Sequence, residues 1–226
     1  GFVVARLLAA EGAAVHIFLF AEEESVKGEA EIALERLYSD IPGVKVHTVL
    51  EESHLTHFER TVEKTDVVID ALLGTGLKGA PRPVMSQAVD MIAGFEGVVI
   101  AVDIPSGVCG DTGVVHGAAV KADCTVTFAF PKRGHFLFPG AAHAGDLCVA
   151  DIGIPHKLAP EQGVQTALLG EEDISELISE RLANTHKGTY GHVAVWAGQK
   201  TSPGAAILAL MGALRSGAGL VSWVAD

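Results

Sequence analysis

Two stretches of this chain share one pattern, in which a short apolar run ends in an aspartate and is followed by a glycine-containing turn. The first is Asp66–Gly79 (DVVIDALLGTGLKG), where the run ends at Asp70. The second is Gly97–Gly107 (GVVIAVDIPSG), where the run ends at Asp103. Such runs are typical of buried parallel strands, whose carboxyl ends deliver ligand-binding loops to one edge of a sheet. The pattern therefore predicts an α/β fold with one site built between the two strand ends.

Segments with helical and strand-like patterns alternate on both sides of these stretches. Helices are predicted at residues 1–10, 22–37, 53–63 and 83–92. Short apolar runs predict strands at residues 14–20, 44–49, 67–69, 98–102, 122–128 and 147–152. Alternation at this spacing indicates a three-layer, Rossmann-like α/β fold with a mostly parallel sheet. Right-handed crossovers would place the carboxyl ends of all the strands at one edge, where ligands bind.

The pattern changes after Pro155. We expect residues 1–156 to form one domain, residues 157–184 to form a linker, and residues 185–226 to begin a second domain. That last part carries the strand–helix–strand pattern of an opening βαβ unit, at residues 192–197, 205–214 and 219–225. The chain begins with glycine and ends within a strand-like run, so we expect it to be part of a longer protein.

The composition argues against several kinds of partner. The net charge of −12, with no basic stripe, argues against nucleic acid. The longest apolar stretch, residues 203–214, is shorter than the about 20 residues that a membrane helix needs, so no membrane contact is expected. Cys109, Cys124 and Cys148 form no C-x-x-C motif and indicate buried thiols in a reducing, cytoplasmic compartment. The sequence leaves a homo-oligomer open.

The residues at the predicted sheet edge suggest chemistry without fixing it. Asp70 and Asp103 could bind sugar hydroxyls, hold a cation or move a proton, and each could also simply cap the following turn. The loop from Gly74 to Ala80 can bring several N–H groups close to a phosphate, although a plain turn is an equal interpretation. Ser106 could be a hydroxyl ligand or a helix N-cap.

The segment after the strand at residues 122–128 could reach the same edge. It carries Lys132, which could act at the site or simply be solvated. His135 and His143 lie in the following loop and are weaker candidates. No histidine spacing indicates a zinc site.

Three motifs together resemble a known family, the NAD(P)H-hydrate epimerase domain, also called the YjeF N-terminal domain. They are Asp66–Gly79, Gly97–Gly113 (GVVIAVDIPSGVCGDTG) and Thr127–Gly140 (TFAFPKRGHFLFPG). Residues 186–191 (HKGTYG) and 204–221 resemble the start of the ADP-dependent NAD(P)H-hydrate dehydratase domain, which has a ribokinase-like fold. The two domains in this order are typical of the bifunctional NAD(P)H-hydrate repair enzymes.

The resemblance implies a role for each site residue. Asp70 and Ser106 match the positions that hold a potassium ion. Asp103 matches a substrate-binding carboxylate beside the reacting ring and is the best candidate for proton transfer, with Lys132 as a second candidate. The loop that binds the hydrated dinucleotide, NADHX or NADPHX, is matched by Gly74, Thr75, Gly76, Leu77, Lys78, Gly79 and Ala80.

The implied reaction is nicotinamide-nucleotide repair. An isomerase interconverts the R and S forms of NAD(P)H hydrate at C6, and a lyase that uses ADP dehydrates the S form. The resemblance also makes Gly1 the last glycine of the family's N-N-G-G-D-G loop and puts the dehydratase's G-A-G-D loop beyond residue 226. We therefore expect this chain alone to be incomplete for both activities.

Two other functions remain open at this level. One is a different α/β nucleotide enzyme, either a kinase or a phosphatase that uses Asp70 as its nucleophile. A D-x-D pair would favour the phosphatase, and the chain has Asp70-Ala71-Leu72 instead. The other is a non-catalytic binding module, which loss of Asp103 or of the glycine loop would favour, and both are present.

Overall fold

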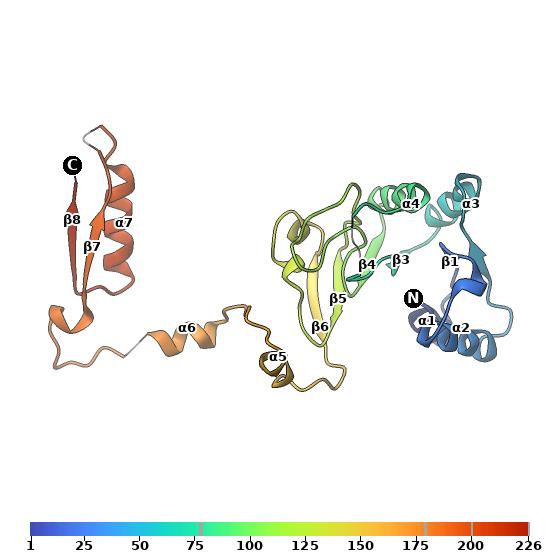
Figure 1. Ribbon diagram of the computed structural model, residues 1–226, viewed down its shortest axis with the longest axis horizontal. Coiled ribbons are helices and arrows are strands. Elements are labelled where there is room, and N and C mark those ends of the chain that lie inside the picture. Colours follow the sequence, from blue (N-terminus) through green and yellow to red (C-terminus); the bar gives the residue numbers. More distant parts are fainter. Residues whose placement is uncertain (77–78, 179, 200, 226) are drawn as a thin grey trace. The chain divides into compact units, whose positions relative to one another are not determined.

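The computed structural model describes residues 1–76, 79–178, 180–199 and 201–225 (Figure 1). The chain divides into two units, Gly1–Ala159 and Pro160–Asp226, and each is described by itself. The boundaries expected for the two domains and their linker stay a prediction. Leu77 and Lys78, which the sequence places in the ligand loop, lie outside the described residues.

Helices and strands alternate along the first unit, as the sequence predicts. They are α1 (Phe2–Ala10), β1 (Ile17–Leu19), α2 (Glu29–Asp40), β2 (Val46–Thr48), α3 (Glu52–Val62), β3 (Val67–Asp70), α4 (Pro83–Ala93), β4 (Val98–Val102), β5 (Cys124–Phe128) and β6 (Asp146–Ala150). The helix predicted over residues 22–37 is interrupted, because a short 3₁₀ turn, η1 (Glu23–Ser25), ends before Gly28. Gly28 has a φ of +65° and starts α2 from a conformation that favours glycine.

Four parallel strands form the main sheet, in the order β3-β4-β5-β6. The register pairs Asp70 with Ala101 and Ala101 with Thr125, so the carboxyl ends of β3, β4 and β5 lie side by side. β1 and β2 form a separate parallel pair. The α/β fold class predicted from the sequence is confirmed, and the edge that should carry the site exists.

The main core lies between helices and strands of both sheets. Its buried side chains come from α3, α4 and β4, and include Leu55, Phe58, Val62, Ala88, Val89, Ile92, Val99 and Ala101. A second cluster joins α1 and α2 to β1 and β2, through Ala5, Leu34, Leu37, Ile17 and Val46. Since Phe18 of β1 packs against Phe58 of α3, with ring centroids 5.1 Å apart, the β1–β2 pair has helices on both faces. Figure 1 shows this layering at the blue end of the chain.

The three cysteines are free thiols, and the prediction that all are buried is wrong. Cys109 and Cys124 are half-buried, and Cys148 is exposed. Cys148 belongs to β6, which pairs only with β5 among the described strands, so it lacks the cover that an inner strand has.

The second unit ends in a βαβ unit, as predicted. Its elements are α6 (Glu171–Leu177), the 3₁₀ turn η4 (Lys187–Tyr190), β7 (His192–Trp196), α7 (Gly204–Arg215) and β8 (Leu220–Val224); the short α5 (Leu158–Glu161) spans the boundary between the units. β7 and β8 pair in parallel and α7 contacts both. No helix among the described residues is long and apolar enough to cross a membrane.

Candidate functional site

The carboxylate of Asp70, at the end of β3, is sealed inside the protein. Asp70 and Ser106 are each 1% exposed. The Ser106 amide donates to Asp70 Oδ2 at 2.7 Å, and the Ser106 hydroxyl donates to Asp70 Oδ1 at 2.6 Å. The Leu73 amide in turn donates to Ser106 Oγ at 2.9 Å. The serine therefore ties the loop after β3 to the loop after β4, and it is a hydroxyl partner of the carboxylate rather than a helix cap.

This buried carboxylate has no cationic side chain bonded to it in the described part of the chain. Burial raises the pKa of the Asp70 carboxyl above its ordinary value, although the two hydrogen bonds from Ser106 and one from the Leu72 amide oppose that shift. The Leu73 carbonyl oxygen lies 3.4 Å from Ser106 Oγ, so carboxylate, hydroxyl and carbonyl oxygens gather at one point. Hard cations prefer oxygen ligands of these kinds.

The depth of Asp70 also bears on the phosphatase alternative. A nucleophilic carboxylate must reach a phosphorus atom, but both oxygens of Asp70 accept hydrogen bonds inside the protein. This environment is that of a structural or cation-binding carboxylate.

The turn after Ser106 requires a glycine. Gly107 has a φ of +97°, and a Cβ atom there would lie 2.1 Å from the Ala118 carbonyl oxygen. The Ser106 carbonyl accepts from the Val120 amide at 2.9 Å, so the loop returns against its own start. The glycine thus allows the close packing that keeps Ser106 beside Asp70.

Asp103 follows β4 directly and lies in a different environment. Its Oδ1 accepts hydrogen bonds from the Thr127 hydroxyl at 3.0 Å and the Phe128 amide at 3.2 Å, and it forms an ion pair with Lys132 Nζ. Lys132 Nζ also donates to Thr127 Oγ1 at 2.8 Å. Oδ2 of Asp103 has no hydrogen-bond partner among the described residues and is not a buried unsatisfied atom. One oxygen is therefore held by the protein, while the other is neither bonded to a described residue nor sealed from solvent.

The surroundings favour an ionised Asp103. Partial burial works against ionisation, but the hydrogen bonds from Lys132, Phe128 and Thr127 outweigh it and lower the pKa of the Asp103 carboxyl below its ordinary value. The side chains of Asp103 and Lys132 are 23% and 21% exposed, so a ligand can reach the pair. Such a carboxylate is ionised and free to accept a proton, although the lowered pKa also makes it a weaker base.

Gly110 brings the glycine loop after β3 close to this pair. A Cβ atom placed on Gly110 would lie 3.5 Å from Thr75 Cγ2 and 3.7 Å from Lys132 Cγ. Gly74, Thr75, Gly76, Gly79 and Ala80 are exposed. The amides of residues 74–76 donate no hydrogen bond to any other described residue, so they are available to a ligand.

The sequence-predicted residues thus come together in two clusters at one sheet edge. Asp70 and Ser106 form one, and Asp103 and Lys132 form the other, with Thr75 adjacent to the second through Gly110. Sequence reasoning missed Thr127, whose hydroxyl lies between Asp103 and Lys132. No local sequence signal marks Thr127, because its place depends on the strand register, which puts it on the same face of the sheet as Ala101.

Fold and site together define a Rossmann-like α/β protein with a polar site at the carboxyl edge of its sheet. Residues 1–134 match the family model described as YjeF-related protein N-terminus. The match covers more than half of the chain, which therefore belongs to this family, and the resemblance seen in the sequence is confirmed.

Curated relatives agree with this assignment. The chain is 42% identical over 222 residues to the bifunctional NAD(P)H-hydrate repair enzyme Nnr of Moorella thermoacetica, a match that covers 98% of the chain and 42% of that protein. It is 38% identical to the Thermofilum pendens protein of the same name, covering 97% and 40%, and 35% identical to that of Escherichia coli, covering 98% and 41%. The chain therefore spans about two-fifths of the length of the relatives it matches.

A solved structure shares the fold. The crystal structure of the yeast protein ynu0 matches with a TM-score of 0.53 and 21% identity, covering 76% of this chain and 68% of that one. At this identity the likeness shows the α/β fold alone.

Proposed function

We propose that the first unit belongs to a domain that, in the full-length protein, interconverts the R and S forms of NAD(P)H hydrate at C6 of the reduced nicotinamide ring. The observation that carries the proposal is the Asp103–Lys132 pair, in which Lys132 and Thr127 hold Oδ1 of an ionised aspartate while Oδ2 stays open. The matched relatives are named NAD(P)H-hydrate repair enzymes, which supports this choice of substrate. The chemistry needs a proton acceptor beside C6, and Asp103 Oδ2 is one.

Two routes invert C6, and both need the pair. In one route the ring opens. Asp103 takes the hydroxyl proton, and the electron pair of the O–H bond forms the C=O bond of an aldehyde at C6. The C6–N1 bond breaks, and its electron pair stays on N1. Lys132 supplies a proton to N1, and the reverse steps on the other face of C6 close the ring as the opposite epimer. In the other, Lys132 protonates the hydroxyl, and the C6–O bond breaks with its electron pair leaving on the water. The N1 lone pair stabilises the cation at C6, and Asp103 takes a proton from the water that adds to the opposite face. General acid–base catalysis of this kind contributes typically about 10²–10⁴-fold to a rate.

The Asp70–Ser106 cluster would bind rather than react. Asp70 and Ser106 would hold a potassium ion, whose positive charge would balance the buried carboxylate and the phosphates of the substrate in an acidic protein. The amides of Gly74–Gly76, which donate to no other described residue, would cradle the dinucleotide together with Gly79 and Ala80. Leu77 and Lys78, in the same loop, remain part of the proposed cradle by resemblance alone.

The second unit would begin the domain that dehydrates the S form with ADP. Its β7-α7-β8 arrangement supports this proposal, as do the full-chain matches to proteins named bifunctional. We also propose that the protein acts in the cytoplasm. Whether it forms a homo-oligomer stays open.

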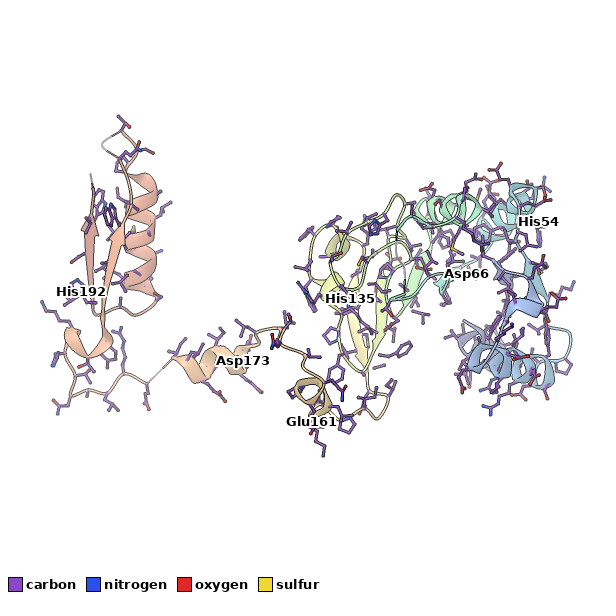
Figure 2. The ribbon with its side chains drawn as sticks, viewed as in Figure 1. His54, Asp66, His135, Glu161, Asp173 and His192 are labelled. Carbon is purple, nitrogen blue, oxygen red and sulfur yellow. The ribbon has the colours of Figure 1, made fainter. Side chains whose placement is uncertain are left out.

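The test starts from one purified epimer of hydrated NADH and the full-length protein. We expect conversion to a mixture of epimers faster than the uncatalysed rate, measured by chiral chromatography. The Asp103→Asn variant should lose this activity, while Asp66→Asn, a control at the opposite, amino end of β3 (Figure 2), should keep it. Near-wild-type interconversion by the Asp103 variant would refute the assigned role.

A further inference from the structure

The imidazole of His135 lies behind the Asp103–Lys132 pair and touches the backbone of both residues. His135 is 5% exposed and ends the 3₁₀ turn η2 (Arg133–His135). Its Nδ1 accepts a hydrogen bond from the Lys132 amide at 3.1 Å, and its Nε2 lies 3.0 Å from the Asp103 carbonyl oxygen. Figure 2 shows His135 in the loop region beside β5 and β6.

These partners fix the protonation of the ring. An amide N–H can only donate, so Nδ1 must be unprotonated, and a carbonyl oxygen can only accept, so Nε2 must carry the hydrogen. Burial lowers the pKa of the His135 imidazole, which agrees with a neutral ring. His135 is therefore a neutral bridge with one defined tautomer.

The two bonded groups depend on this ring. Among the described residues, the Lys132 amide and the Asp103 carbonyl have no other hydrogen-bond partner. Asp103 also has a φ of +69°, which few non-glycine residues adopt and which needs support from its surroundings. The hydrogen bond from His135 holds the carbonyl group of Asp103. The Asp103 amide donates to the Val126 carbonyl at 2.8 Å, and this bond holds the amide side of the same residue.

The turn that carries the ring is itself fixed to the site. The Gly134 amide donates to the Gly110 carbonyl at 2.7 Å, and a Cβ atom on Gly134 would lie 2.4 Å from the Cys109 carbonyl oxygen. His135 therefore has little freedom to move, and it transmits the position of this turn to the backbone of Asp103.

We propose that His135 is a positioning residue, whose neutral imidazole fixes the backbones of Asp103 and Lys132 so that their side chains meet with Asp103 Oδ2 open to the substrate. The proposal rests on the function proposed above for this pair. A 1 Å displacement of a reacting group can cost about 10²-fold in rate, so loss of this bridge should lower the rate measurably.

The first test needs no activity and no variant. In full-length protein with ¹⁵N-labelled histidine, we expect His135 to show an unprotonated Nδ1 and a protonated Nε2 at neutral pH. A ring with its hydrogen on Nδ1, or a charged ring, would overturn the proposal. This result is independent of whether the protein epimerises anything.

The second test separates the two bonds. His135→Leu removes both, His135→Asn keeps an acceptor near the position of Nδ1, and His135→Gln keeps a donor near the position of Nε2. With His135→Leu we expect kcat for epimer interconversion to fall about 10²-fold while KM changes little, because the reacting group is displaced rather than the substrate released. The Asn and Gln variants should each recover part of that loss.

The matched control is His143→Leu. His143 is a half-buried histidine in the same loop region, and its Nδ1 lies 3.0 Å from the Val120 carbonyl oxygen, with no bond to Asp103 or Lys132. We expect this variant to keep kcat. A folded His135→Leu protein with wild-type kcat, or one that changes only KM, would overturn the proposal. Inactive wild-type protein would instead refute the proposed function, while the tautomer measurement would still judge the geometry.

Discussion

β3 and β4 both end in an aspartate followed by a glycine-containing turn, yet the two carboxylates lie in opposite surroundings. Asp70 is sealed, accepts hydrogen bonds on both oxygens and has a raised pKa. Asp103 is accessible, is paired with a lysine through one oxygen and has a lowered pKa. The same sequence pattern therefore produces one sealed carboxylate, for which we propose cation binding, and one accessible, ion-paired carboxylate, for which we propose proton transfer. The difference comes from the side chains packed against each strand end, which are Ser106 beside Asp70 and Lys132 beside Asp103.

The largest effect that distinguishes the two aspartates should be on rate. Asp103→Asn should lower epimer interconversion by about 10²–10⁴-fold, since it removes the proton acceptor and keeps the shape of the side chain. Potassium should still stabilise this variant, because Asp70 and Ser106 are unchanged. Chiral chromatography gives the rate, and thermal unfolding with and without potassium gives the second readout. Loss of the potassium effect in this variant would show that the two clusters are not separable.

The next effect concerns potassium and Asp70. A ligand present at 100 times its dissociation constant stabilises the folded state by about 2.7 kcal/mol, and we expect potassium to do so for the wild type. Asp70→Ala should remove this gain, measured as the free energy of unfolding in potassium minus that in choline salt. Asp90→Ala, at an exposed position of α4, is the control and should keep the gain. An unchanged potassium titration in Asp70→Ala would exclude the cation site.

Removing the lysine should make Asp103 more like an ordinary aspartate. In Lys132→Gln, the pKa of the Asp103 carboxyl should rise, because the hydrogen bond and the positive charge that oppose its burial are lost. Interconversion should slow by about 10²-fold. Carbonyl ¹³C shifts followed against pH measure the first effect, and Lys121→Gln, an exposed lysine, is the control. A pKa that stays depressed would mean that other groups control it.

The smallest expected effect is a pH dependence of potassium binding. Because burial raises the pKa of Asp70, the folded protein holds a proton there more readily than the unfolded chain does, and proton and cation compete. The potassium-induced gain in melting temperature should therefore grow as pH rises through the Asp70 pKa and shrink below it. Melts at about pH 5 and about pH 8, with and without potassium, measure this difference. A gain that is larger at the lower pH would contradict the site.

Most of the fold could be predicted from the sequence, because the elements are short and their apolar patterns are local. The strands at residues 98–102 and 122–128 correspond to β4 and β5 within two residues at each end. The interruption before α2 was missed, since an acidic run with helical spacing hides the effect of one glycine at positive φ. The exposed Cys148 was missed because strand order, which makes β6 an outer strand, is a long-range property.

The candidate site could be predicted in part. The carboxyl ends of parallel strands meet at one edge of a sheet, so Asp70 and Asp103 could be predicted as site residues from the pattern. Lys132 was a weaker candidate, because a lysine four residues after a strand is more often solvated. Thr127 and the bridging role of His135 depend on register and on how the turn at 133–135 folds back, and neither has a local signature.

The sequence by itself determined the strands, the aspartates at their ends and the family to which the chain is similar, because these depend on residues close together along the chain. Only the tertiary structure decided which aspartate is buried and which is paired. Burial and pairing raise or lower a pKa according to the groups within a few ångströms, and Ser106, Thr127, Lys132 and His135 reach the strand ends from separate loops and strands. Two similar motifs could therefore be assigned different chemistry only after folding had surrounded them.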